Sequence, residues 1–210
     1  NKPEGYDLDI ANLIGKDLGV KTKIINVAPA ARIPSLQTGK IDVVLCNTTR
    51  TLQRAQQVSF TNTYSVAASS ILSKKGSGIE TLKGLAGKTV ATTKGSPFAP
   101  IIQAAAPTAK VIQLDSPADD VTAVETGQAD AAIEDGGFLL YSAKQHPDLQ
   151  VSSGSVIPLY YNSFAIEQGQ PNLLAWLNEF IFELNTDGEN KTIYKKWFGV
   201  DPAYQLNPTY

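Results

Sequence analysis

The chain has 210 residues, with 18 Lys and Arg against 20 Asp and Glu, and this near balance does not indicate a nucleic-acid surface. Its hydrophobic content of 42% and charged content of 18% are typical of a globular protein and exclude a disordered or fibrous chain. No apolar run approaches the roughly 20 residues that a membrane-spanning helix needs, and the single cysteine, Cys46, excludes an internal disulfide bond.

Two stretches of the chain, residues 33–47 and 121–135, have similar sequences. Each predicts a short helix, a T-G-x-x-D turn and a buried strand that ends in a polar side chain. The two copies begin 88 residues apart and align without gaps. The repeat therefore predicts two similar α/β lobes that form a two-lobed clamp.

The first lobe opens with a predicted helix over residues 10–18, where apolar side chains recur at helical spacing. Asp7 or Asp9 is expected to cap its start, and Gly19 to end it in a left-handed conformation. Residues 20–27 alternate at their start and predict a strand. The beginning of the chain thus has the order helix then strand.

The first copy of the repeat follows, with a helix that begins near Pro34 and ends at residues 38–40. Residues 41–46 form a continuous apolar run, which is typical of a parallel strand covered on both faces. Residues 64–73 are extended in character and end in the turn-rich segment 74–78. We expect this extended passage to be the first crossing between lobes.

The second lobe is predicted to alternate helices and strands. In chain order the expected elements are a helical turn at 79–85, a strand at 89–93, a helix at 98–106, a strand at 111–114, the second repeat at 121–135 and a helix at 138–144. Residues 156–161 are extended and would carry the chain back, before a strand at 163–167.

Two amphipathic helices complete the chain, over residues 173–184 and 190–198. They must pack on the first lobe, so we expect that lobe to be discontinuous, with residues 1–66 plus 162–210, and the second lobe to comprise 67–161. Each lobe is then a mixed sheet flanked by helices. Two hinge crossings indicate opening and closing around a ligand.

Polar side chains follow the predicted strands at the end where ligands bind in open α/β sheets. In the first lobe Asn47, Thr49 and Arg54 are suited to a carboxylate, because a guanidinium can grip it with two parallel hydrogen bonds. In the second lobe Asp135 is suited to an ammonium group. A zwitterionic amino acid carries both groups on one carbon atom.

These residues also have ordinary structural explanations. Arg54 has the character of a surface-paired charge, and Asp135 that of a helix cap. Cys46 is expected to be a small buried group and His146 a surface residue. No metal-ligand spacing or phosphate-binding loop is present, so we expect neither a metal nor a cofactor.

At N-T-T-R-T-L-Q-R, residues 47–54, the chain resembles the polar amino-acid-binding proteins of ABC importers, solute-binding protein family 3, which are similar to the ligand core of ionotropic glutamate receptors. The supporting pieces, in order, are G-Y-D-L-D-I-A at 5–11, R-I-P-S-L-Q-T-G-K-I-D at 32–42, Q-V-S-F-T-N-T-Y at 57–64, L-K-G-L-A-G-K-T-V at 82–90, K-G-S at 94–96 and D-G-E-N-K-T-I-Y-K-K-W-F at 187–198. Together they cover nearly all of the chain.

The resemblance implies a type II periplasmic-binding-protein fold and a monomeric, extracytoplasmic receptor that delivers a polar L-amino acid to an ABC importer, membrane-associated if it is lipid-anchored. It places one group of residues on the α-carboxylate and Asp135 on the α-ammonium. The implied carboxylate ligands are Asn47, Thr48, Thr49 and Arg54 from the first lobe and Gly95 and Ser96 from the second.

Two features depart from the family pattern. The family normally opens with a central strand and an aromatic residue that packs on the ligand, and this sequence begins after both. We therefore expect either a longer protein or another segment that supplies the strand. Pro97 stands where many relatives carry Thr or Ser, which leaves Ser96 with more of the carboxylate contact.

Two other classes of function remain open at this stage. One is an enzyme similar to cyclohexadienyl dehydratases, with Glu134 or Glu167 as the general acid. The other is the ligand-binding module of a sensor or of a channel related to glutamate receptors. The side chain of the preferred amino acid is also open. Because Asp135 is expected to bind the α-ammonium of the ligand, acidic or neutral polar side chains are favoured.

Overall fold

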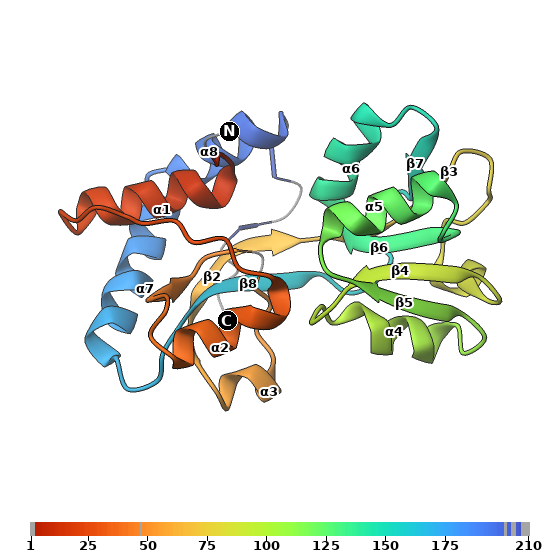
Figure 1. The fold of residues 1–210 in the computed structure, drawn as a ribbon. Helices are drawn as coiled ribbons and strands as arrows, with labels where there is room; N and C mark the ends of the chain where they lie inside the picture. Colours follow the sequence, from red (N-terminus) through yellow and green to blue (C-terminus); the bar gives the residue numbers. More distant parts are fainter. Residues whose placement is uncertain (1–2, 47, 200, 203–204, 207–210) are drawn as a thin grey trace. The chain divides into compact units, whose positions relative to one another are not determined.

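The structure is a computed structural model that describes residues 3–46, 48–199, 201–202 and 205–206. The chain folds into two compact units (Figure 1). Unit 1 comprises Asn1–Val27, Ala31–Val66 and Tyr160–Tyr210, and unit 2 comprises Ala28–Ala30 and Ala67–Leu159. Each unit combines strands and helices, as the α/β prediction requires. The lobe limits expected from the sequence, 1–66 with 162–210 and 67–161, stay a prediction.

Unit 1 contains a three-stranded sheet in the order β1-β8-β2. The strands are β1 (Val43–Val44), β2 (Ser59–Ala67) and β8 (Tyr160–Ile166). Strand β1 pairs with β8 in antiparallel fashion, with Val43 opposite Ile166. The expectation of a parallel strand over 41–46 is therefore wrong for this pairing and too long, because the neighbour of β1 is the strand on which the chain returns.

The helices of unit 1 come from both ends of the chain. They are α1 (Tyr6–Asp17), α2 (Arg32–Gln37), α3 (Leu52–Ala55), α7 (Pro171–Thr186) and α8 (Glu189–Phe198). A short 3-10 turn η1 (Pro29–Ala31), whose first two residues belong to unit 2, precedes α2. Helix α8 packs against both α1 and α7. The discontinuity predicted from the two C-terminal helices is thus present in the fold.

The ends of α1 differ in part from the prediction. Gly19 has φ +68°, the left-handed conformation expected after the helix. The start was predicted wrongly, because Gly5 is the N-cap residue and no side chain caps the helix. Asp7 and Asp9 lie in the first turn, where their negative charges interact favourably with the positive end of the helix dipole.

Residues 20–27 do not form the predicted strand. Val20 is 58% exposed and Ile24 is 44% exposed, and neither belongs to the β1-β8-β2 sheet. The apolar residues of this segment do alternate, but a strand also needs the backbone of a neighbouring strand for its hydrogen bonds. An alternating sequence does not reveal whether such a neighbour is present.

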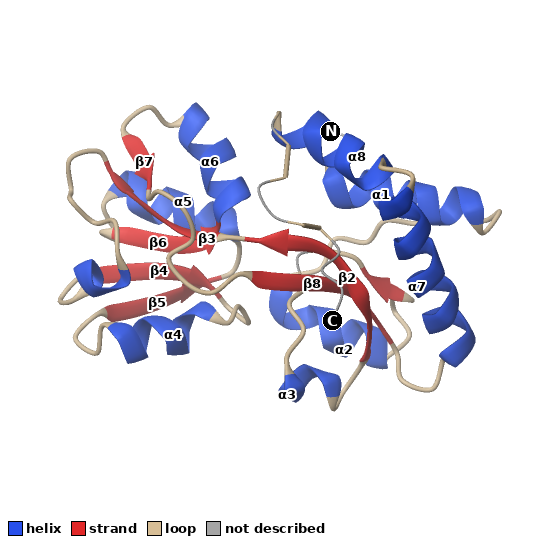
Figure 2. Ribbon diagram, turned by 180° about the vertical axis from the view of Figure 1, so that it is seen from behind, coloured by secondary structure: helices blue, strands red, loops and turns tan. Residues whose placement is uncertain are grey.

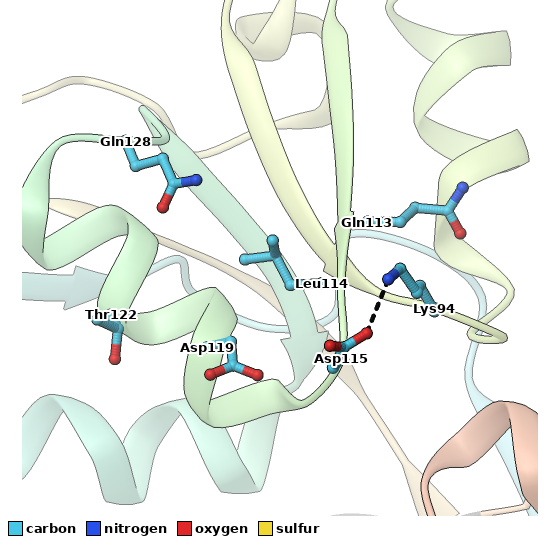
Figure 3. A pocket seen from close by; sticks show the side chains of 7 residues that line it. All are labelled: Lys94, Gln113, Leu114, Asp115, Asp119, Thr122 and Gln128. Atoms are coloured by element: carbon cyan, nitrogen blue, oxygen red, sulfur yellow. Dashed lines mark hydrogen bonds and ion pairs between the residues drawn. The ribbon is translucent and has the colours of Figure 1, made fainter.

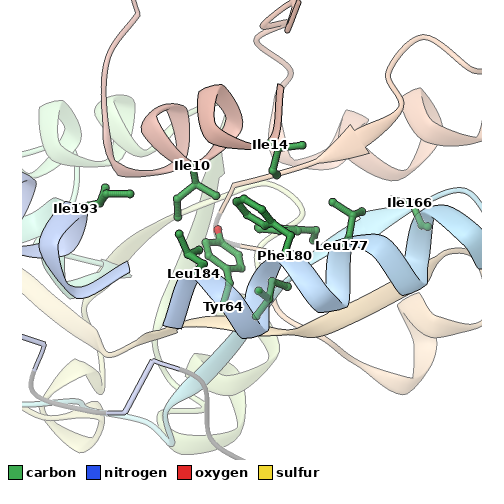
Figure 4. Close-up of a cluster of buried hydrophobic side chains, with 10 residues drawn as sticks. Ile10, Ile14, Tyr64, Ile166, Leu177, Phe180, Leu184 and Ile193 are labelled. Atoms are coloured by element: carbon green, nitrogen blue, oxygen red, sulfur yellow. The ribbon is translucent and has the colours of Figure 1, made fainter. Parts of the chain in front are cut away.

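The core of unit 1 brings α1, α7 and α8 onto the sheet (Figure 4). Its buried members are Ile10, Ile14, Tyr64, Phe164, Ile166, Leu177, Phe180, Ile181, Leu184 and Ile193. The ring of Tyr64 lies 4.5 Å from that of Phe164, and its hydroxyl donates to Oδ1 of Asp7 over 2.7 Å. Burial raises the pKa of Tyr64 well above its usual value, so the phenol stays protonated and acts as a donor.

Replacing Tyr64 with phenylalanine should lower the free energy of unfolding by about 1.5 kcal/mol, because a buried hydrogen bond to a carboxylate is lost. Urea unfolding would measure this as a lower midpoint with an unchanged slope. Tyr141→Phe is the matched control, since Tyr141 is 64% exposed and should change stability by less than about 0.5 kcal/mol. Equal effects of the two variants would contradict the prediction.

Unit 2 is built on a five-stranded sheet in the order β5-β4-β6-β3-β7 (Figure 2). The strands are β3 (Ser69–Lys74), β4 (Thr89–Thr93), β5 (Lys110–Leu114), β6 (Ala131–Asp135) and β7 (Leu149–Val151). Strand β4 runs parallel to β5 and β6, whereas β3 is antiparallel to β6 and β7. The sheet is therefore mixed.

Helices lie on both faces of this sheet (Figure 1). They are α4 (Phe98–Ala105), α5 (Pro117–Thr126) and α6 (Gly136–Gln145), with the 3-10 turn η2 (Leu82–Leu85) before β4. Helix α4 connects β4 to β5, and α5 then carries the chain back past β4 to β6. The strand order consequently reverses between β4 and β6, and their carboxyl ends form the topological switch point of unit 2.

Most elements predicted for unit 2 are confirmed, including the strand at 89–93 and the helices near 98–106 and 138–144. Strand β7 was not predicted, because it has only three residues. The segment expected at 156–161 does carry the chain back from unit 2 to unit 1, although residues 156–159 form no strand and β8 begins only at Tyr160.

The repeat is confirmed as two helix–turn–strand units. Gly39 and Gly127 both follow their helices with positive φ, at 67° and 79°. Asp130, the turn aspartate of the second copy, accepts from the backbone N–H of Thr89 over 2.8 Å. The shared T-G-x-x-D pattern therefore reflects helix termination and, in unit 2, attachment of the turn to a neighbouring strand.

Candidate functional site

The turn after β4 lies at the switch point of unit 2 and contains two of the predicted ligand residues. Gly95 has φ +78°, and a Cβ there would lie 3.0 Å from the backbone of Ala30 in the same unit. The N–H of Ser96 donates to the carbonyl of Thr93 over 3.1 Å, and its hydroxyl lies 3.0 Å from that of Thr92. The turn is thus held in one conformation directly before α4.

Asp135 ends β6 on the other side of the switch point. Its Oδ1 accepts from the backbone N–H of Phe138 over 3.0 Å, so Asp135 caps α6. Gly136 allows this helix start to approach β3, since a Cβ there would lie 2.9 Å from Oγ of Ser70. The structural explanation of Asp135 as a cap is correct, and the cap fixes the direction of its carboxylate.

The predicted carboxylate-binding segment of unit 1 follows β1. Asn47 lies outside the described residues. Thr48 is buried, its hydroxyl donates to the carbonyl of Cys46, and its own carbonyl accepts from the N–H of Ser163 over 3.2 Å. The hydroxyl of Thr49 donates to Oδ1 of Asn162 over 3.4 Å. Both threonines therefore attach this segment to itself and to β8.

Arg54 lies on α3, whose N-cap residue Thr51 accepts from the N–H of Arg54 over 3.2 Å. Its Nη1 donates to the carbonyl of Thr49 over 3.0 Å. Burial lowers the pKa of Arg54, the nearby guanidinium of Arg32 lowers it further, and Tyr160 opposes this. An arginine nevertheless stays protonated, so unit 1 concentrates positive charge in a partly desolvated place.

Arg32 is a candidate that the sequence did not single out. It begins α2, and its Nε is buried without a hydrogen-bond partner among the described residues. It also contacts Cys46, whose thiol pKa is raised by burial although the charge of Arg32 acts in the opposite direction. Cys46 is therefore a protonated, partly buried thiol, and Arg32 adds a second cation close to Arg54. The local sequence around Arg32, R-I-P-S-L, does not indicate that its side chain lies close to Arg54.

A surface hollow in unit 2 lies beside the turn but does not coincide with the predicted residues (Figure 3). The side chain of Lys94 points to Asp115, and Nζ lies 2.7 Å from Oδ1 in an exposed ion pair. The lining contains neither Gly95, Ser96 nor Asp135. The cation of Lys94 is thus directed to its neighbour at the surface.

The two carboxylates considered for catalysis differ in environment. Glu134 is buried, its pKa is raised by burial, and its Oε1 accepts from the N–H of Thr93 over 3.0 Å. Glu167 is exposed after β8. Among the described residues no three His, Cys, Asp or Glu side chains gather as a metal site, and no helix is long and apolar enough to cross a membrane.

The chain is similar in sequence to solute-binding proteins. GlnH, the glutamine-binding protein of an ABC transporter in Bacillus subtilis, is 35% identical over 204 residues, which cover 95% of this chain and 74% of GlnH. A glutamine-binding protein of Geobacillus stearothermophilus is 40% identical over 154 residues, which cover 71% of this chain and 59% of that protein. The similarity extends along almost the whole chain.

Solved structures agree with this. An ancestral arginine-binding protein was solved with arginine, at a TM-score of 0.87 and 34% identity, and with glutamine, at a TM-score of 0.88 and 33% identity. Each comparison covers 93% of this chain and 88% of the other. The predicted two-lobed type II fold is confirmed.

These relatives are receptors of transporters and not enzymes, so the receptor prediction is supported over the dehydratase-like alternative. The model of bacterial extracellular solute-binding proteins, family 3, matches residues 1–200. The chain therefore belongs to the bacterial extracellular solute-binding proteins of family 3.

Proposed function

We propose that this solute-binding protein captures a polar L-amino acid and presents it to an ABC importer. The observation that carries the proposal is the complementary charge of the two units. Unit 1 holds the guanidinium of Arg54 near that of Arg32, and unit 2 ends β6 with the carboxylate of Asp135. These charges match the two ends of a zwitterion.

Arg54 binds the α-carboxylate in this proposal. Its partial burial strengthens an ion pair, and the repulsion from Arg32 is relieved when an anion arrives. The hydroxyl of Ser96 donates to the same carboxylate while it accepts from the hydroxyl of Thr92, the turn at Gly95 brings the backbone close to the ligand, and Asp135 takes the α-ammonium. Thr48 and Thr49 act mainly by fixing the backbone that supports Arg54, because their hydroxyls already bind protein groups.

L-Glutamine is the first ligand to test. The glutamine-binding relatives support it, as does the prediction of an acidic or neutral polar side chain. Lys94 does not favour an acidic side chain, because its ammonium pairs with Asp115. L-Arginine is the second ligand to test, given the arginine-binding relatives.

Isothermal titration calorimetry of the full chain with each of the twenty L-amino acids tests the proposal. We expect at least one polar amino acid to bind with a Kd of about 1 μM or lower, a free energy of about −8 kcal/mol. D-Glutamine is the control, because reversing the configuration separates the two charged groups from their partners. Absence of binding by all twenty would overturn the proposal.

The protein acts outside the cytoplasm in this proposal, as its family does, and as a monomer. Attachment to the membrane would come from a lipid anchor. Light scattering after gel filtration of the full chain would give its mass, which we expect to match the 22.5 kDa of one chain. A dimer mass would refute the monomer.

A further inference from the structure

Two buried acidic side chains, Asp120 and Glu134, lie next to the end of β4 in unit 2. Asp120 of α5 is completely buried and Glu134 of β6 is 7% exposed. Thr93, the last residue of β4, contacts both of them. Its hydroxyl donates to Oδ2 of Asp120 over 2.7 Å, and its backbone N–H donates to Oε1 of Glu134 over 3.0 Å.

The two carboxyl groups also meet each other. The two side chains interact electrostatically, and Oδ1 of Asp120 is buried without a hydrogen-bond partner among the described residues. Two carboxylates cannot hydrogen-bond to each other, because both are acceptors. A proton on one of the two groups supplies the donor that this contact needs.

Asp120 is the group that carries this proton. Burial and the contact with Glu134 raise the pKa of Asp120 to about 8, against the opposing effect of the Thr93 hydroxyl. Burial also raises the pKa of Glu134, but hydrogen bonds from Thr93 and Asp120 act in the opposite direction. At neutral pH, Asp120 is thus a neutral acid that donates to the Glu134 carboxylate.

The charged groups around the pair favour the protonated form. The carboxylates of Asp119 on α5 and Asp135 on β6 add negative charge. Strand β3 places Ser70 opposite Glu134, and β4 contributes Thr93, so both offer hydroxyls and no charge. The nearest cation in sequence, that of Lys94, is paired with Asp115.

The Asp120–Glu134 pair lies beyond the point where the backbone hydrogen bonds between β4 and β6 end. These strands pair at Val90 with Ala131 and at Ala91 with Ala132. At Thr93 the N–H binds the side chain of Glu134 instead of a β6 carbonyl. The next residues are the turn that contains Gly95 and Ser96. The end of β4 is therefore attached to β6 by a side chain, whereas its backbone pairing with β5 continues to Thr93.

We propose that Asp120 and Glu134 are positioning residues for the ligand, which share one proton to hold the end of β4 beside Asp135, and that loss of this proton weakens binding. The proposal rests on the proposed function for its ligand. When the proton leaves, two buried carboxylates repel each other and the hold on Thr93 loosens. Gly95, Ser96 and Asp135 then lose the spacing that binding needs.

Titration calorimetry of the full chain with L-glutamine, from about pH 6.5 to pH 9.5, tests the proposal. We expect the affinity of the wild type to fall about tenfold with a midpoint near 8, the magnitude of about one lost buried hydrogen bond. Asp120→Asn should keep the neutral affinity within about threefold and lose this fall, because an amide donates to Glu134 without a titrating proton. Glu134→Gln should behave in the same way.

Asp119→Asn is the matched control, since it removes an adjacent exposed carboxylate and should keep the fall in affinity, with its midpoint moved only slightly to lower pH because Asp119 is the smallest cause given for the raised pKa of Asp120. The ammonium of the ligand titrates in all four proteins, so the ratio of wild-type to variant Kd at each pH is the readout. A ratio for Asp120→Asn that does not change with pH would overturn the proposal.

A measurement without ligand separates this proposal from the proposed function. The folded state binds the proton of Asp120 up to about pH 8, whereas an unfolded aspartate releases it near pH 4, so its stabilising effect is complete below about 4 and lost by about 8. The stability of the wild type relative to Asp120→Asn should therefore fall as pH rises through this window. A constant difference refutes the shared proton, whereas failure of all twenty amino acids to bind refutes only the proposed function.

Discussion

Replacing Arg54 with alanine should weaken the binding of L-glutamine by about 100-fold or more, because truncating one member of a desolvated, hydrogen-bonded ion pair costs about 2–5 kcal/mol. The guanidinium is partly buried and stands near a second cation, Arg32, so its field is poorly screened. Calorimetry at neutral pH on the full chain measures the change in Kd.

Two further variants identify the cause of this loss. Arg54→Lys keeps the charge but not the planar fork, and we expect it to recover part of the affinity, with a loss of about tenfold. Gln53→Ala changes an exposed side chain on the same helix, α3, and should alter Kd by less than about twofold. An Arg54→Ala protein that binds like the wild type would remove Arg54 from the site.

Replacing Asp135 with asparagine should also lower the affinity by about 100-fold, while leaving stability nearly unchanged. Asparagine caps helices as well as aspartate does, so the hydrogen bond to the N–H of Phe138 is kept and only the charge is lost. Asp135→Ala loses both the charge and the cap. Its free energy of unfolding should fall by about 1 kcal/mol more than that of Asp135→Asn.

Ser116→Ala is the matched control for the capping effect. Ser116 caps α5 by accepting from the N–H of Asp119 over 3.2 Å, so its loss should cost about 1 kcal/mol of stability without a change in Kd. Calorimetry and urea unfolding on all three variants give both quantities. Normal affinity of Asp135→Asn would show that Asp135 serves only as a cap.

The repeat predicted the fold well because helix termination has a local cause. Gly39 and Gly127 both adopt positive φ, which a sequence reveals through glycine itself. Pairing between strands has no such local sign. Residues 20–27 alternate as a strand does and are not one, and β1 pairs with β8, which is distant in sequence. Local patterns therefore gave the elements but not all of the partners.

The candidate site was predicted in the same uneven way. Arg54 and Asp135 follow from the rule that ligands bind beyond the carboxyl ends of strands. The proximity of Arg32 to Arg54 and the contact between Asp120 and Glu134 could not be predicted, because each joins residues from different elements. Even the cap formed by Asp135, which the sequence did suggest, is compatible with both a structural and a binding role.

The divided sequence of unit 1 has a consequence for how the chain folds. Tyr6 of α1 donates a hydrogen bond to Asn190 of α8, a contact between residues 184 positions apart. Almost all of unit 2, by contrast, is the continuous segment Ala67–Leu159. Contacts close in sequence form sooner, since less chain must be ordered to make them. Unit 2 should therefore fold first, and unit 1 should complete its core only after the last helix has been synthesised.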